Sequence, residues 1–189
     1  MDISSVVSFA IQAFLFLIVV AIGADFLIVH FSKQMRSPFL RTPRAYFDTI
    51  FEALKVKAGD VVYDLGCGDG SLLLECAIRN PGVRCVGIER NPLLCAYARL
   101  RARMRRNLKN LTFVRGNLFD SDLSAATHIY TYLVPSAMEL LSKKIAHEGT
   151  HVRLASRAFR LLGRTPTSVH QLSTTSGAHG QHQLFVYDL

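Results

Sequence analysis

A turn with three glycines at alternate positions, Gly66, Gly68 and Gly70, is the stretch of this sequence best suited to bind a ligand. Glycine adopts positive φ values at little steric cost and lets a ligand approach the backbone closely. Two carboxylates accompany the glycines, because Asp64 precedes the turn and Asp69 lies inside it. A dinucleotide site needs G-x-G-x-x-G and a pyrophosphate, which two carboxylates would repel. Two carboxylates instead suit a ligand that carries an ammonium and a sulfonium. This predicts S-adenosylmethionine (SAM) as the ligand.

Two further strand ends support this ligand. Residues 83–89 read as an apolar strand ending at Glu89, where a carboxylate can accept both ribose hydroxyls. The predicted strand 111–117 ends at Asn117, and open α/β sheets bind ligands at the carboxyl ends of their strands. We expect Asn117 to hydrogen-bond the adenine edge and Leu118 to pack on its face; the alternative is that Asn117 only starts a turn. The predicted SAM-binding residues are Asp64, Gly66, Cys67, Gly68, Asp69, Gly70, Glu89, Asn117 and Leu118.

The sequence around these residues alternates between strand and helix patterns, which is typical of an α/β fold with a parallel sheet. Apolar, β-branched runs indicate the strands, and apolar residues at i, i+3, i+4 and i+7 indicate the first helix of the domain. Another helix has a clear start, because Asn91 is a favourable N-cap residue and Pro92 a favourable first residue. The predicted strands are 61–65, 83–89, 111–117, 126–133, 151–156, 168–172 and 183–188, and the predicted helices are 46–54, 71–77, 92–106 and 137–145.

The N-terminal segment is strongly apolar, in a chain whose mean hydropathy is +0.23. Residues 6–24 carry no charge, and a helix of that length crosses a hydrocarbon core of about 30 Å. No lysine or arginine precedes Lys33, which favours an uncleaved anchor over a signal peptide. The basic residues that follow place the catalytic domain on the cytoplasmic side, or on the matrix side in a mitochondrion. We therefore predict a single-pass membrane protein.

These patterns divide the chain into three parts. We expect a transmembrane anchor over 1–32, a basic linker over 33–45 and a catalytic domain over 46–189. The linker has two interpretations, either a solvated segment that contacts anionic lipid headgroups or a lid over the substrate entrance.

The net charge of +8 comes largely from the predicted helix 92–106. Its arginines fit an anionic membrane surface, a nucleic acid or a plain solvated helix face, and the membrane surface is the partner that we expect. The four cysteines lie nine or ten residues apart without a C-x-x-C pair, so we expect no metal site.

The motif D-L-G-C-G-D-G at 64–70, together with Glu89, resembles class I (seven-β-strand) SAM-dependent methyltransferases. The N-terminal apolar segment, E-R-N-P at 89–92 and L-V-P-S at 133–136 resemble more narrowly the membrane-anchored protein-lysine methyltransferases of the ATP synthase c-subunit and adenine nucleotide translocase type. The resemblance covers most of residues 40–189. It departs after the fifth strand, where that family has an Arg-Phe-Pro-like stretch and this chain has Ala158 between Arg157 and Phe159.

The resemblance implies an α/β fold: a Rossmann-like seven-stranded methyltransferase sheet with helices on both faces, preceded by one N-terminal transmembrane helix. It implies SAM as cofactor, with Asp64 and the glycine turn at the methionine end, and a lysine of a membrane protein as methyl acceptor. Tyr132, Pro135 and Ser136 would border the methyl group. An acceptor lysine, with a pKa near 10.4, must lose its proton first, and an apolar pocket lowers that pKa. Tyr132 is a candidate base, although a tyrosine at a strand end also serves for packing.

Other functions stay open at this point. The acceptor is alternatively a small molecule, a quinone or a lipid, and the chain is alternatively a non-catalytic SAM-binding protein. A nucleic acid is not expected, because base-modifying methyltransferases have an Asn/Asp-Pro-Pro-aromatic motif after strand four. This chain has Thr131, Tyr132, Leu133 and Val134 there.

Overall fold

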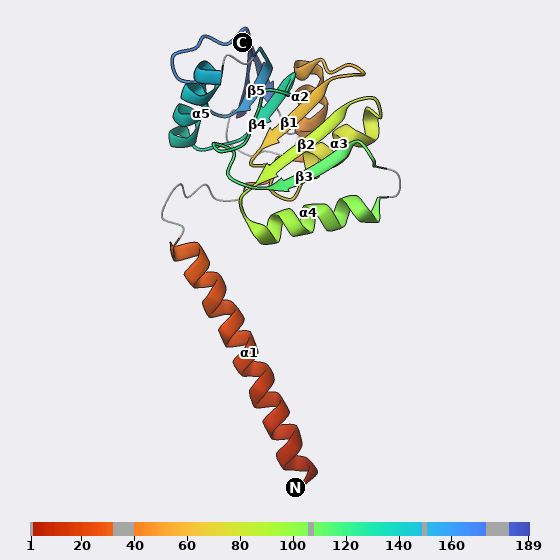
Figure 1. Cartoon of the computed structure of the whole chain (residues 1–189), viewed down its shortest axis with the longest axis vertical. Coiled ribbons are helices and arrows are strands. Elements are labelled where there is room, and N and C mark those ends of the chain that lie inside the picture. Colours follow the sequence, from red (N-terminus) through yellow and green to blue (C-terminus); the bar gives the residue numbers. More distant parts are fainter. Residues whose placement is uncertain (1, 32–39, 106–107, 149–150, 173–181) are drawn as a thin grey trace. The chain divides into compact units, whose positions relative to one another are not determined.

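The computed structural model of the protein describes residues 2–31, 40–105, 108–148, 151–172 and 182–189. The chain divides into two compact units, Met1–Arg36 and Ser37–Leu189. In the first unit, the described element is the helix α1 (Ile3–Phe31) (Figure 1). The predicted division at residues 32 and 45 stays a prediction, and 33–39 of the predicted linker lie outside the described residues.

The predicted membrane anchor is corrected by the structure. Crossing a membrane takes about 20 consecutive, predominantly apolar residues in one helix. Among the described residues, no helix is found that has the necessary length and apolar character. The prediction of a single-pass anchor over 1–32, with the catalytic domain on the cytoplasmic or matrix side, is therefore wrong by this finding.

The second unit is built on a mixed sheet with the strand order β3-β2-β1-β4-β5-β7-β6, seven strands within the described residues. The strands β1 to β5 are parallel to one another, and β7 is antiparallel to both β5 and β6. The order reverses between β1 and β4, which is the place where open α/β sheets bind ligands. The strands are β1 (Val61–Leu65), β2 (Arg84–Glu89), β3 (Leu111–Arg115), β4 (His128–Thr131), β5 (Arg153–Arg157), β6 (Ser168–Leu172) and β7 (His182–Asp188).

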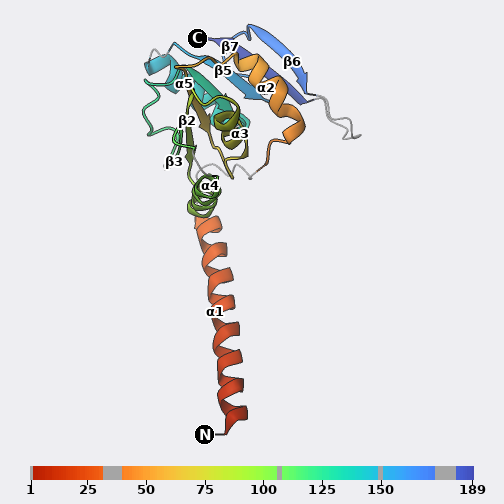
Figure 2. The same ribbon diagram turned by 90° about the vertical axis from the view of Figure 1, so that its right-hand side faces the viewer.

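Helices lie on both faces of this sheet. Figure 2 shows α2 (Phe47–Leu54) and α3 (Ser71–Arg79) on one side and α5 (Pro135–Glu148) on the other. A 3-10 helix, η1 (Arg44–Tyr46), leads directly into α2. The helix α4 (Pro92–Met104) follows β2, and the side chain of its N-cap Asn91 accepts hydrogen bonds from two backbone N–H groups, as predicted. Its predicted end at residue 106 lies outside the described residues.

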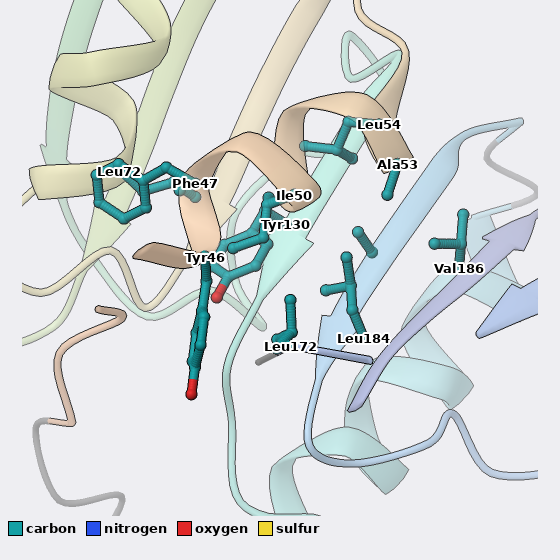
Figure 3. Close-up of a cluster of buried hydrophobic side chains, with 11 residues drawn as sticks. Tyr46, Phe47, Ile50, Ala53, Leu54, Leu72, Tyr130, Leu172, Leu184 and Val186 are labelled. Atoms are coloured by element: carbon teal, nitrogen blue, oxygen red, sulfur yellow. The ribbon is translucent and has the colours of Figure 1, made fainter. Parts of the chain in front are cut away.

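The core on the α2 side is a cluster of buried side chains, shown in Figure 3. Ile50 and Leu54 are fully buried one helical turn apart, because the apolar spacing of α2 places both on the face that meets the sheet. Leu184 of β7 belongs to the same cluster. The predicted α/β sheet with its seven strands and covering helices is thus confirmed, with strand ends that differ by a few residues.

Replacing Leu54 with alanine should lower the free energy of unfolding by about 2–5 kcal/mol, because it removes buried methyl groups and leaves a cavity. Urea unfolding of the full chain measures this. The matched control is Leu162→Ala, whose side chain is 64% exposed and which should change the free energy of unfolding by about 0.5 kcal/mol or less. Equal effects of the two substitutions would contradict the packing described for α2.

Candidate functional site

The turn between β1 and α3 depends on its three glycines. Gly66, Gly68 and Gly70 have φ values of +81°, +55° and +70°, in the left-handed region that other residues rarely adopt. A Cβ atom on Gly70 would also lie 2.4 Å from the ring of Phe113, so this position leaves no space for a side chain. The turn therefore brings bare backbone to the carboxyl edge of β1.

The carboxylate of Glu89 connects this turn to the start of α4. Its Oε2 accepts the backbone N–H of Gly68 at 2.8 Å, and its Oε1 accepts that of Asn91 at 2.8 Å. Since β1 and β2 are parallel, both loops leave the same edge of the sheet. Each carboxylate oxygen has a second lone pair, so Glu89 can hold both loops and still accept hydrogen bonds from a ligand.

Asp64 is buried inside β1, directly before the turn. Only 5% of its surface is exposed, and it stands opposite Gly87 of β2 and Tyr130 of β4. Burial raises the pKa of Asp64 well above its usual value, and the nearby carboxylates of Glu89 and Asp69 raise it further. A cationic group of a ligand would relieve this unfavourable charge. The environment of Asp64 thus fits the ammonium that the sequence predicts.

Asp69, in contrast, is bound by side chains of the protein. Its Oδ2 accepts hydrogen bonds from Arg101 at 2.9 Å and from the hydroxyl of Ser71 at 2.7 Å, and it pairs with Arg41. Burial raises the pKa of Asp69, but the hydrogen bonds from Ser71 and Arg41 outweigh this, so the pKa lies below its usual value. Asp69 therefore anchors the turn to α4 and to the segment before η1.

Tyr130 stands on β4 next to Asp64 and is 2% exposed. Its hydroxyl lies 2.9 Å from the hydroxyl of Thr42, in the segment that precedes η1. Burial raises the pKa of Tyr130 above its usual value. Figure 3 shows its ring beside α2, with the hydroxyl directed away from that helix. Tyr130 is therefore a neutral phenol at the edge of the site.

The remaining predicted cofactor residues lie in different surroundings. Cys67 is buried, and its sulfur packs so closely on Gly87 that a Cβ there would approach it to 2.7 Å. Asn117 uses its side chain locally, donating to Asp120 at 3.0 Å and accepting from the N–H of Phe119 at 3.3 Å. This geometry is that of a turn, the alternative that the sequence left open. Leu118 lies beside it, half-buried.

The predicted catalytic residues follow β4. Tyr132 is half-buried, and its ring lies 4.2 Å from the guanidinium carbon of Arg157. Pro135 and Ser136 begin α5, and both are exposed. The structure brings Tyr132 to the face that carries Tyr130, whereas the roles of all three residues stay predictions.

Sequence reasoning missed four residues of this edge. Arg101 contacts Asp69 and Thr42 contacts Tyr130 from positions distant in the chain, and no local sequence pattern predicts these contacts. Tyr130 reads as an ordinary strand residue. Arg157 did give a signal, because an arginine in a buried strand is unusual.

The sequence matches the family described as the ANTKMT methyltransferase domain over residues 64–168. A "Protein-lysine N-methyltransferase" of Saccharolobus islandicus is 30% identical over 158 residues, which cover 79% of this chain and 92% of that protein. A lysine N-methyltransferase of the ATP synthase c-subunit, from Caenorhabditis elegans, is 33% identical over 106 residues. That match covers 56% of this chain and 54% of the relative, so the alignment spans about half the length of that relative.

Among solved structures, an RNA methyltransferase from Salinibacter ruber in complex with S-adenosyl-L-homocysteine is 30% identical and superimposes with a TM-score of 0.68. The match covers 79% of this chain and 93% of that chain. The site described above, with its glycine turn, Asp64 and Glu89, fits SAM, from which S-adenosyl-L-homocysteine is formed by loss of the methyl group.

Replacing Asp64 with asparagine should make the ligand-free protein more stable at neutral pH. The folded state holds the Asp64 proton to a higher pH than the unfolded state does. The free energy of unfolding therefore falls as the pH rises from about 4 through the raised pKa. Asparagine removes this dependence, so the stability gain should be near zero at pH 4 and grow toward pH 7. Urea unfolding over this pH range measures it.

The control for this experiment is Asp122→Asn. Asp122 is exposed, and the backbone N–H of Ser124 lowers its pKa, so this substitution should bring no gain at neutral pH. An Asp64→Asn variant that is less stable than the parent at pH 7, without ligand, would contradict the unfavourable burial of a charged carboxylate at Asp64.

Replacing Glu89 with alanine should lower the affinity for SAM at least about tenfold, because both loops lose a charge-assisted hydrogen bond. Titration calorimetry gives the affinity. Glu139→Ala is the matched control, since Glu139 is an exposed carboxylate on α5 that pairs with Lys143. Unchanged SAM binding by Glu89→Ala would exclude Glu89 from the cofactor site.

Proposed function

Because the chain belongs to the ANTKMT methyltransferase domain family, we propose that it transfers the methyl group of SAM to the side-chain amine of a lysine in a protein. The chain is a SAM-dependent methyltransferase. The observation that carries the lysine acceptor is the relative named a protein-lysine N-methyltransferase, of which the match covers 92%.

The residues of the carboxyl edge have distinct roles in this proposal. When bound, SAM supplies an electrophilic methyl group on a sulfonium. Asp64 would hold the ammonium of its methionine end, the glycine turn would let the ligand approach the backbone, and Glu89 would accept hydrogen bonds from the ribose hydroxyls. Two observations support this assignment. Burial and neighbouring carboxylates raise the pKa of Asp64, and backbone N–H groups hold both oxygens of Glu89 in place.

The acceptor amine has to be neutral before it attacks. Tyr130 is a poor base, because burial raises the pKa of its phenol and keeps it protonated. Desolvation in an apolar pocket disfavours the charged form of an incoming lysine and so lowers its pKa. In the transfer, a bond from the amine nitrogen to the methyl carbon would form as the sulfur–methyl bond breaks. The products would be S-adenosylhomocysteine and a methylammonium, which exchanges its proton with water. Most of the rate enhancement of such a transfer comes from aligning the amine with the methyl group in a site shielded from water.

The acceptor that we propose is a lysine of a membrane protein. Its support is the name of the Caenorhabditis elegans relative, a lysine methyltransferase of the ATP synthase c-subunit. RNA is the competing acceptor, because the similar Salinibacter ruber structure is titled an RNA methyltransferase. Small molecules, quinones and lipids are further acceptors that the experiment has to separate.

The test is transfer of label from methyl-labelled SAM to an extract of cells that lack this protein. Protein, lipid and RNA are separated after incubation with the purified chain, its Glu89→Ala variant or the Glu139→Ala control. We expect label in a protein band, lost with Glu89→Ala and kept with Glu139→Ala, and mass spectrometry should place it on a lysine amine. Label confined to RNA or to lipid would overturn the lysine acceptor.

A further inference from the structure

Arg157, the last residue of β5, is a buried arginine held between two aromatic rings. Only 4% of its surface is exposed. Its guanidinium carbon lies 4.9 Å from the ring centre of Tyr46 and 4.2 Å from that of Tyr132. Both distances are within the range of cation–π attraction, which fixes the side chain in place.

The hydrogen-bonding capacity of this guanidinium is not used up. Within the part of the chain that the structure describes, its buried Nε and Nη1 atoms have no hydrogen-bond partner. Arginine stays charged at any physiological pH, and leaving buried N–H donors unpaired is costly. Rings compensate the charge in part, but they do not replace hydrogen-bond acceptors. A buried, oriented guanidinium with two nitrogens that lack a hydrogen-bond partner among the described residues indicates an anionic ligand.

The strand register places Arg157 at the cofactor edge. Asp64, Tyr130 and Ala155 stand opposite one another on β1, β4 and β5. Since side chains alternate along a strand, Arg157 lies on the same face as Ala155, two residues nearer the carboxyl edge. Its contact with Tyr132 places the guanidinium beyond Tyr130 on that face. Asp64 on β1 and Arg157 on β5 thus lie on one face of the sheet, with Tyr130 on β4 between them and Tyr132 directly after β4.

We propose that Arg157 binds the carboxylate of the methionine end of SAM. An α-amino acid end carries an ammonium and a carboxylate on the same carbon, so a site for it needs opposite charges on its two sides. Asp64 supplies the negative side and Arg157 the positive one, and guanidinium–carboxylate hydrogen bonds are strong and directional. The inference rests on the proposed use of SAM and adds the residue that recognises its charged end.

The test compares SAM with decarboxylated SAM, which keeps the sulfonium, the ammonium and the adenosine. Calorimetry on the full chain should show SAM binding about 10- to 100-fold more tightly than the decarboxylated form, the value of a charge-assisted hydrogen bond. Arg157→Met should lose this preference, chiefly through weaker binding of SAM. Arg160→Met should keep it. Arg160 is the matched control, an exposed arginine three residues further along that stacks on Phe185 at 5.0 Å.

Two results would overturn the proposal. Equal affinity of the parent chain for both compounds would show that the carboxylate is not recognised, and this measurement needs no variant to fold. A preference for SAM that persists in Arg157→Met would assign the carboxylate to another residue. Neither result depends on the methyl acceptor, whereas failure of the parent to bind SAM at all would contradict the proposed function itself.

Discussion

The site depends on one hydrogen-bonding arrangement, the carboxylate of Glu89 shared between two backbone N–H groups. It holds the glycine turn after β1 at a fixed distance from the start of α4. The glycines need this support, because positive φ values and missing side chains make the turn costly in conformational entropy. Arg101 adds a second connection, from α4 to the side chain and carbonyl of Asp69. The turn is therefore ordered before any ligand arrives.

Three acids meet at this edge, and the protein treats each differently. Asp69 is neutralised by arginines, Glu89 is satisfied by backbone N–H groups, and Asp64 is left buried with a raised pKa. The charge of Asp64 destabilises the fold and becomes favourable only beside a cation. Selectivity for a cationic ligand is thus obtained at the expense of stability, a trade that is common at binding sites.

Residues close in sequence made much of this architecture predictable. The apolar run before Asp64, the alternate glycines and the N-cap Asn91 act through neighbours, so their pattern predicts the sheet, the turn and the start of α4. The position of the Arg157 side chain depends on the rings of Tyr46 and Tyr132. Contacts between segments distant in the chain produce no periodic pattern in the sequence, so they could not be predicted from it. The apolar N-terminal segment predicted a membrane anchor that the described residues do not contain. The side chain of Asn117 makes hydrogen bonds within its own turn, and its role toward the adenine stays a prediction.

The segment from Arg41 to Tyr46 contacts three different strand ends within a few residues. Arg41 pairs with Asp69 after β1, Thr42 meets Tyr130 on β4, and Tyr46 lies against Arg157 at the end of β5. Because one short piece of backbone carries all three contacts, displacing it at one strand end strains the other two. Opening of this segment is therefore a cooperative event, and amide hydrogen exchange along it should give one common free energy of opening instead of a different value for each residue.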